Sequence, residues 1–279
     1  MMRMSGLQHT GVANSVSLTV DHDLTLLIPA YNEEARLPRT LRDAKAFLDD
    51  WGIDYRVIVI DNRSADRTGE IASRFGYRFS TIRQEIPGKG AAVRMGMLAS
   101  RSRIVAFTDA DLPFDLSCLR MAYEKINSRK CSVVFGSRNI SGMAPVVQRS
   151  LMRTVASYVF RKLVSQLVSR DVTDTQCGLK VFSHHAARQI FSQTMVNGFA
   201  FDAEVIYITH LLSFPYCRVP VTLVNDEGST VSLVRNAFPM LRDVLRVRWQ
   251  ALRGVYRLRP TEALEPEFGV PQIPLSKAA

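Results

Sequence analysis

Short apolar runs, each followed by polar residues, constrain the fold of this chain more than any other feature. LTLLIPAY, YRVIVID and RIVAFTDAD begin at residues 24, 55 and 103. Between them lie segments with apolar residues near helical spacing, such as NEEARLPRTLRDAKAFLDDWG over residues 32–52. Runs of this length indicate buried strands. Strands that alternate with helices predict an α/β fold, with a mostly parallel sheet flanked by helices.

Polar side chains stand where the predicted strands end. Tyr31, Asp61 and Asp109 each occupy such a position. Ligands of parallel α/β sheets bind at the carboxyl ends of the strands. We therefore expect these three side chains to converge on one cleft.

The length of 279 residues fits one large domain or one domain with an appendage. We expect a mobile arm over residues 1–23, a globular domain over 24–234, a basic amphipathic helix over 235–260 and a loose, proline-rich tail over 261–279. No apolar run is long enough for a membrane-spanning helix, and the first residues lack the apolar core of a signal peptide. The four scattered cysteines predict reduced thiols in a cytosolic protein.

The net charge of +10 favours an anionic partner. Arginine alternates with apolar residues in two segments, about 146–170 and 235–259. This composition is typical of helices that lie in a membrane interface. The alternative is a pair of packing helices with solvated basic faces. No recognised nucleic-acid motif is present, so we expect no nucleic-acid partner.

The pair of carboxylates in Asp109-Ala110-Asp111 suggests metal chemistry. Two carboxylates this close raise each other's pKa, and a divalent cation removes the conflict. Mg²⁺ usually joins one or two carboxylates to substrate phosphates. Asp109 and Asp111 are therefore candidate ligands for Mg²⁺ or Mn²⁺ in a metal–diphosphate site. The alternative is a solvated turn in which Asp111 caps the next helix.

Several further motifs occur in a defined order along the chain. They are PAYNEE, VIDNRSADRT, PGKGAAVRMGM, GSR, DTQCGLKVF and FAFDAE. In this order and spacing, over roughly residues 24–232, the chain resembles the family 2 glycosyltransferases of the GT-A fold. Within them it is most similar to the polyprenyl-phosphate sugar transferases, in particular the dolichyl-phosphate β-glucosyltransferases. The resemblance implies a GT-A catalytic domain over 24–234, with 146–170 as an amphipathic acceptor or membrane segment.

The resemblance also implies a donor site. The nucleotide sugar would contact Pro29, Ala30, Tyr31, Glu33, Asp61, Lys89, Asp109, Ala110, Asp111 and Arg235. Asn62 stands where the family often has a second aspartate, which leaves the preferred base open. Thr230 stands where relatives carry a lysine, and Arg235 would replace it. Alternatives are that Glu33 only balances a helix dipole and that Lys89 is solvated on a surface turn.

The implied acceptor is a lipid monophosphate. A guanidinium binds phosphate through two parallel hydrogen bonds. The candidates for the acceptor phosphate are Arg138, Arg149, Arg153, Gln176 and Lys180. The residues expected to act in catalysis are Asp111, Asp202 and Arg138. Alternatives are a solvated basic helix face for Arg149 and Arg153, and a helix cap for Asp202.

We therefore predict an inverting, metal-dependent glycosyltransferase. It would move a hexose, glucose favoured, from a nucleotide sugar, UDP-glucose favoured, to a polyprenyl or dolichyl phosphate. It would act as a peripheral protein on the cytosolic face of a membrane. Three alternatives stay open: a GDP-mannose donor, a sugar nucleotidyltransferase, and a non-catalytic membrane-binding scaffold.

Overall fold

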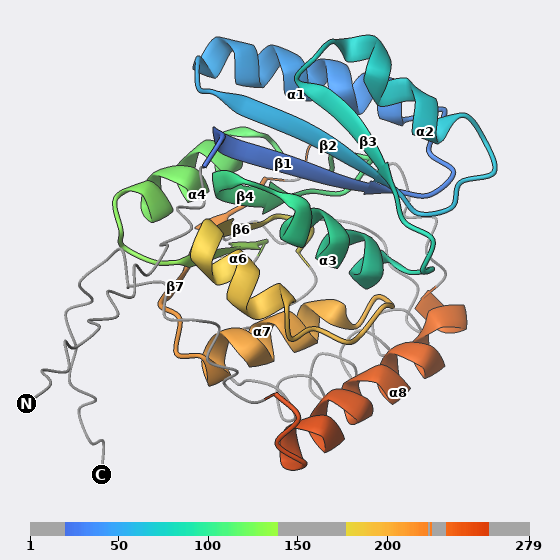
Figure 1. Cartoon of the computed structure of the whole chain (residues 1–279), viewed down its shortest axis with the longest axis vertical. Helices are drawn as coiled ribbons and strands as arrows, with labels where there is room; N and C mark the ends of the chain where they lie inside the picture. Colours follow the sequence, from blue (N-terminus) through green and yellow to red (C-terminus); the bar gives the residue numbers. More distant parts are fainter. Residues whose placement is uncertain (1–19, 139–176, 223, 225–232, 257–279) are drawn as a thin grey trace, which may run out of the picture.

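One seven-stranded sheet, with helices on both faces, organises the chain (Figure 1). The computed structural model describes residues 20–138, 177–222, 224 and 233–256. The strands are β1 (His22–Ala30), β2 (Tyr55–Asp61), β3 (Phe79–Arg83), β4 (Ser102–Phe107), β5 (Val133–Ser137), β6 (Lys180–Ser183) and β7 (Tyr216–Pro220). Their order is β3-β2-β1-β4-β6-β5-β7, and the described pairs are parallel except those of β6 with β4 and β5. The predicted mostly parallel α/β fold is confirmed.

Two groups of helices cover the two faces of the sheet. The helical segments are α1 (Leu37–Trp51), α2 (Thr68–Ile71), the 3₁₀ turn η1 (Ala72–Phe75), α3 (Lys89–Ala99), α4 (Ser117–Asn127), α6 (His184–Phe191), α7 (Phe201–Leu211) and α8 (Leu233–Leu252). Buried residues of α1, α2 and α4 belong to one apolar cluster, and those of α3, α6, α7 and α8 to another. Figure 1 shows α1 and α3 on opposite sides of β1.

The two apolar clusters explain why the strand sequences are continuously apolar. Leu26 and Ile28 point toward the cluster of α1 and α4, whereas Leu27 points toward that of α3. All three side chains have no exposed surface. Each such burial stabilises the fold by roughly 1.5–3 kcal/mol. A parallel sheet with both faces covered needs apolar residues at every strand position rather than at alternate ones.

The first helix begins later than its sequence pattern suggests. Asn32 has a left-handed backbone, with φ of 54°, and the helix α1 begins only at Leu37, with a proline in its first turn. Gly52 ends the helix in the left-handed conformation, with φ of 71°. The residues between Ala30 and Leu37 therefore form a loop above the end of β1, where a ligand can approach.

The helix expected over residues 235–260 begins at Leu233 and ends at Leu252. Gly254, with φ of 65°, follows its end. The predicted amphipathic segment 146–170 lies outside the described residues. In the part of the chain that is described, no helix combines the length and the apolar character that crossing a bilayer requires. The predicted division into arm, domain, helix and tail stays a prediction.

Candidate active site

The Asp109-Ala110-Asp111 turn is fixed between β1 and α1. Thr108 N–H donates to Leu27 O at 3.0 Å, and Leu112, with φ of 43°, donates its N–H to Asp109 O at 3.1 Å. The Thr40 hydroxyl of α1 donates to Ala110 O at 2.5 Å. Helix α4 begins only at Ser117. The alternative in which Asp111 caps that helix is therefore wrong.

One buried oxygen of the carboxylate pair lacks a hydrogen-bond partner among the described residues. That oxygen is Oδ1 of Asp111. Burial, and after it the charge of Asp109, raises the pKa of Asp111. A Cβ on Gly178 would come within 2.3 Å of Asp109 Oδ2, so only glycine leaves room for that carboxylate. Over the described ranges, no third His, Cys, Asp or Glu completes a metal cluster. The residues thus fit Mg²⁺ or Mn²⁺ with substrate phosphate oxygens as further ligands.

Lys89 lies beside this pair at the first position of α3. Its ammonium pairs with Asp109 Oδ1, and its side chain is only 20% exposed. Burial lowers the pKa of Lys89, but Asp109 and then Asp202 outweigh it, so the net shift is upward. Lys89 is therefore an ammonium at neutral pH. The alternative of a solvated lysine on a surface turn is wrong.

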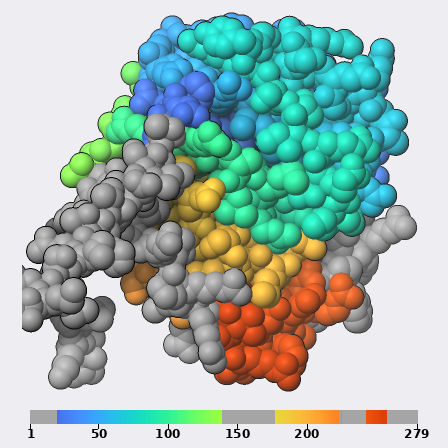
Figure 2. Space-filling model, in the orientation of Figure 1, coloured from blue at the N-terminus to red at the C-terminus, as the bar shows by residue number. Residues whose placement is uncertain are grey.

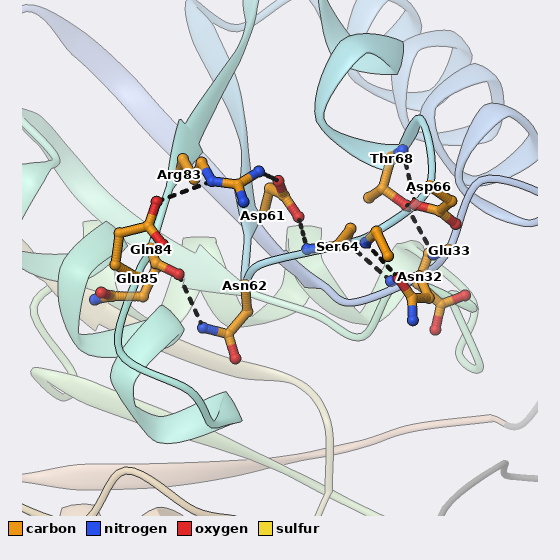
Figure 3. Close-up of polar contacts among 11 residues, drawn as sticks. Asn32, Glu33, Asp61, Asn62, Ser64, Asp66, Thr68, Arg83, Gln84 and Glu85 are labelled. Atoms are coloured by element: carbon orange, nitrogen blue, oxygen red, sulfur yellow. Dashed lines mark hydrogen bonds and ion pairs between the residues drawn. The ribbon is translucent and has the colours of Figure 1, made fainter.

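Asp61 lies in the end of β2, next to the loop after β1 (Figure 3). Its side chain is 3% exposed; Oδ1 accepts from Ser64 N at 2.9 Å, and Oδ2 from Arg83 at 3.3 Å. Ala30 is in register with Asp61, and Pro29 with the residue before it. Tyr31, 62% exposed, follows directly. The register thus brings the ends of β1 and β2 to the same edge of the sheet, and the expected convergence of the side chains on one cleft stays a prediction.

Glu33 is held by an arginine rather than by a helix end. Arg36 donates to both of its carboxylate oxygens, at 2.7 and 2.8 Å. Figure 3 shows Glu33 beside Thr68, whose Oγ1 accepts from Glu33 N–H at 2.8 Å. Burial raises the pKa of Glu33, and Arg36 opposes that shift. The first turn of α1 holds no acidic residue, so the helix-dipole alternative is wrong.

Asn62 explains one departure from the family pattern. Its Nδ2 donates to Gln84 O at 3.3 Å (Figure 3). The same Nδ2 donates to Ile86 O at 2.7 Å, and Oδ1 accepts from Gly88 N at 2.7 Å. An aspartate here would direct a carboxylate at two carbonyl oxygens. Asn62 therefore fixes the loop that leads to Lys89.

Asp202 and Lys180 form a buried ion pair. Lys180 Nζ lies 2.6 Å from Asp202 Oδ1 and donates to Cys177 O at 2.9 Å. Lys180 is 1% exposed because β6 is inserted antiparallel between β4 and β5, opposite Phe107. The predicted contact of Lys180 with an acceptor phosphate is therefore wrong: its ammonium is enclosed and holds Asp202. The N-cap of α7 is Ala200, so the alternative of Asp202 as a cap is wrong as well.

Part of the predicted site cannot be placed. Arg149, Arg153 and Gln176, and the side chain of Arg235, lie outside the described residues. Arg138 directly follows β5. The structure adds Arg36 and Arg83, which sequence reasoning missed. The three-residue spacing from Glu33 was a signal for Arg36, whereas Arg83 meets Asp61 only through strand pairing.

Residues 25–191 match the profile of the family described as "Glycosyl transferase family 2". The chain belongs to this family. It is thus a glycosyltransferase by descent, and the predicted resemblance is confirmed.

Three relatives from different organisms share one name. The Dictyostelium discoideum protein "Dolichyl-phosphate beta-glucosyltransferase" is 32% identical over 252 residues, which cover 85% of this chain and 77% of that protein. The Homo sapiens protein of the same name is 31% identical over a stretch that covers 86% of this chain and 79% of that protein. The Saccharomyces cerevisiae protein of that name is 29% identical over a stretch that covers 84% of this chain and 76% of that protein.

Solved structures of the fold include glucosyl-3-phosphoglycerate synthase from Mycobacterium tuberculosis. Its complex with Mn²⁺, uridine-diphosphate-glucose and phosphoglyceric acid matches with a TM-score of 0.61 at 17% identity, covering 83% of this chain and 81% of that one. Its complex with Mg²⁺ and uridine-diphosphate matches with a TM-score of 0.59 at 18% identity. This match covers 84% of this chain and 80% of that one. At this identity the likeness concerns the fold.

The first prediction concerns the buried ion pair. We expect Lys180→Met to lower the free energy of unfolding by about 3–5 kcal/mol, because it leaves the carboxylate of Asp202 buried without its cation. The matched control is Lys45→Met, whose ion pair with Asp49 is exposed and should cost less than about 1 kcal/mol. Urea unfolding measures both. Equal losses of unfolding free energy in the two variants would mean that the buried ion pair stabilises the fold no more than the exposed one.

The second prediction concerns the loop before α3. Asn62→Asp removes both donors to carbonyl oxygens, so we expect a loss of about 1–3 kcal/mol in unfolding free energy together with weaker nucleotide binding. Asn32→Asp is the control, because Asn32 uses its Oδ1 to accept from Ala65 N at 2.9 Å, which a carboxylate also does. Thermal unfolding and titration calorimetry with UDP decide. A control variant as damaged as Asn62→Asp would contradict this account.

Proposed function

We propose that this protein transfers a hexosyl group, glucose favoured, from UDP-glucose to dolichyl or another polyprenyl phosphate, with inversion at the anomeric carbon. The observation that carries the proposal is the Asp109–Asp111 pair, with one buried oxygen unpaired and Lys89 alongside. It occurs in a family 2 chain whose curated relatives are named dolichyl-phosphate β-glucosyltransferases. The donor and acceptor are inferred from those relatives.

The proposed reaction exchanges one bond for another at the anomeric carbon. An oxygen of the acceptor phosphate attacks that carbon, and the bond from the carbon to the donor's diphosphate breaks. Negative charge therefore grows on the nucleoside diphosphate. A divalent cation held by Asp109 and Asp111 would supply electrostatic stabilisation there. The ammonium of Lys89 places a second positive charge against the same region.

On the acceptor side, no strong base is required, because a phosphate monoester is already anionic near neutral pH. We assign the holding of that phosphate to Arg138, with Arg149 and Arg153 as further candidates. Asp202 would orient hydroxyls of the sugar. Its carboxylate is fixed by Lys180. Burial raises the pKa of Asp202, and Lys180 followed by Lys89 opposes the shift.

On the donor side, we assign the nucleotide to the ends of β1 and β2. Asp61 would accept a hydrogen bond from the base, and Tyr31 and Glu33 would lie along the ribose. The backbone of Pro29 and Ala30 would approach the nucleotide closely. Arg235 would reach the diphosphate if the preceding segment folds over it.

We place the protein at a membrane surface through α8, which Figure 2 shows along one edge of the molecule. Val244 and Val247 face the core at 1% exposure, whereas Leu245, Trp249 and Leu252 are 51%, 53% and 73% exposed. The three exposed residues recur at helical spacing on one face. Exposed arginines of the same helix are Arg242, Arg246 and Arg248, and the exposed Arg253 directly follows its end. Apolar and cationic residues together suit a bilayer interface with anionic headgroups.

The third prediction tests the reaction. Purified protein with Mn²⁺ or Mg²⁺, liposomes carrying dolichyl phosphate, and radiolabelled UDP-glucose should put label into the organic phase. Asp111→Asn should lower the rate by about a hundredfold or more, because it removes charge from the metal–diphosphate site. Asp115→Asn is the control, since Asp115 only accepts from Ser117 N at 2.7 Å in the same loop.

The same assay separates the alternatives. Label from GDP-mannose instead of UDP-glucose would replace the sugar and keep the reaction class. Pyrophosphate release from a nucleoside triphosphate would indicate a nucleotidyltransferase. Liposome binding without turnover of any sugar nucleotide would leave a non-catalytic scaffold.

The fourth prediction tests the membrane surface. We expect Leu245→Gln/Trp249→Gln/Leu252→Gln to weaken binding to vesicles with anionic lipid by about tenfold or more, because each apolar side chain contributes on the order of 1 kcal/mol when half-exposed surface enters lipid. Tyr77→Gln, at a site 82% exposed in the turn before β3, is the control. Vesicle sedimentation measures binding. Unchanged binding of the triple variant would remove α8 from the interface.

A further inference from the structure

Glu204 is a fully buried carboxylate that the proposed reaction does not use. It lies in α7, two residues after Asp202, and has no exposed surface. Met195 N donates to its two oxygens at 2.9 and 3.0 Å, and Val196 N donates at 2.8 Å. The hydroxyl of Tyr256, just beyond α8, donates at 2.8 Å. One side chain thus ties the chain after α8 to the loop over residues 194–198.

The other side of that loop supports the helix that carries Lys89. Ala91 N donates to Asn197 O at 3.2 Å. Arg94 donates to Asn197 Oδ1 at 2.6 Å. A Cβ on Gly90 would lie 2.4 Å from Val196 O, so the two backbones touch. The loop therefore sets where the first turn of α3 sits.

We propose that Glu204 is a positioning residue for the donor site. It joins the end of α8 to the 194–198 loop, and the loop places the first turn of α3, and with it Lys89 against Asp109. The inference rests on the proposed function, because it assigns a role to Lys89 in donor binding. It adds a physical connection between the helix proposed to contact the membrane and the site of transfer.

The chemistry of Glu204 suits this role. Burying a carboxylate is costly unless donors surround it. A carboxylate is an acceptor-only group that takes several donors at once. Glutamine would offer one oxygen and turn an amide N–H₂ toward backbone N–H groups. An apolar residue would leave the N–H groups of Met195 and Val196 without this acceptor.

The test uses Tyr256→Phe, which keeps the ring and removes the hydroxyl that contacts Glu204 and, at 2.9 Å, Gln250 Oε1. Glu204→Gln is the stronger change, and it leaves the hydroxyl of Tyr256 beside Gln250. Tyr207→Phe is the matched control. Its ring lies 5.6 Å from that of Tyr256, on the same helix as Glu204, and the change leaves the four hydrogen bonds to Glu204 intact. Each full-length variant is compared with wild type by amide hydrogen exchange and by steady-state kinetics with UDP-glucose.

We expect amide exchange in residues 89–92 and 194–198 to be about fivefold faster or more in Tyr256→Phe, and faster still in Glu204→Gln. The KM for UDP-glucose should rise by about three- to tenfold, and kcat per folded enzyme should fall as well, because Lys89 also faces the charge that grows on the diphosphate. A residue that only supported the fold would lower the melting temperature and the folded fraction, and leave that KM unchanged.

Two results would overturn the proposal. One is faster exchange confined to 194–198, with residues 89–92 as protected as in wild type. The other is an unchanged KM in both variants, or the same rise in Tyr207→Phe. If wild-type protein transfers no glucose, the proposed function fails, whereas the exchange of residues 89–92 still decides whether Glu204 positions α3.

Discussion

Repulsion among carboxylates gathered at the carboxyl ends of the strands is the constraint on which the site depends. Burial, and after it the charge of Asp109, raises the pKa of Asp111, and Asp109 also acts against ionisation of Asp202. Two lysines offset this repulsion: Lys89 at the start of α3 pairs with Asp109, and Lys180 of β6 pairs with Asp202. The cations come from elements far apart in sequence, so the site is formed only when the whole sheet and α3 are in place.

The topology of the sheet decides where these two lysines lie. β6 runs antiparallel between β4 and β5, and its register sets Lys180 opposite Phe107 inside the sheet. Its ammonium therefore ends within the protein, against Asp202. Lys89 leaves the first turn of α3 beside the turn after β4, and its side chain is partly exposed. Lys180 thus holds the enclosed carboxylate of Asp202, whereas Lys89 pairs with Asp109 on the more open side.

The sequence was sufficient for features that depend on local pattern. Continuous apolar runs predict a sheet covered on both faces, and the structure buries Leu26 and Leu27 on opposite faces. The Asp109–Asp111 pair was a local signal because two carboxylates this close raise each other's pKa. The role of Lys180 was missed because it depends on the antiparallel insertion of β6. No local signal distinguishes a lysine that ends in the core from one that reaches a phosphate.

Asn62 and Glu204 were beyond prediction for a related reason. Each binds backbone groups of segments that are distant in sequence, and hydrogen bonds to backbone leave no trace in the identity of the partner residues. From the sequence, Asn62 only leaves the preferred base open, whereas the structure shows it fixing the loop before Lys89. The residues that position a site are harder to recognise than those that carry its charge.

The first turn of α7 carries both a predicted site residue, Asp202, and the positioning residue Glu204. Asp202 and Glu204 are two residues apart, which on a helix separates their side chains by roughly 200°. One carboxylate is thereby directed to Lys180 in the sheet and the other to the 194–198 loop and Tyr256. A shift of α7 would disturb both ends at once. Burying two carboxylates in one turn lowers stability. Their contacts fix the position of the sheet that carries Asp109 relative to the end of α8.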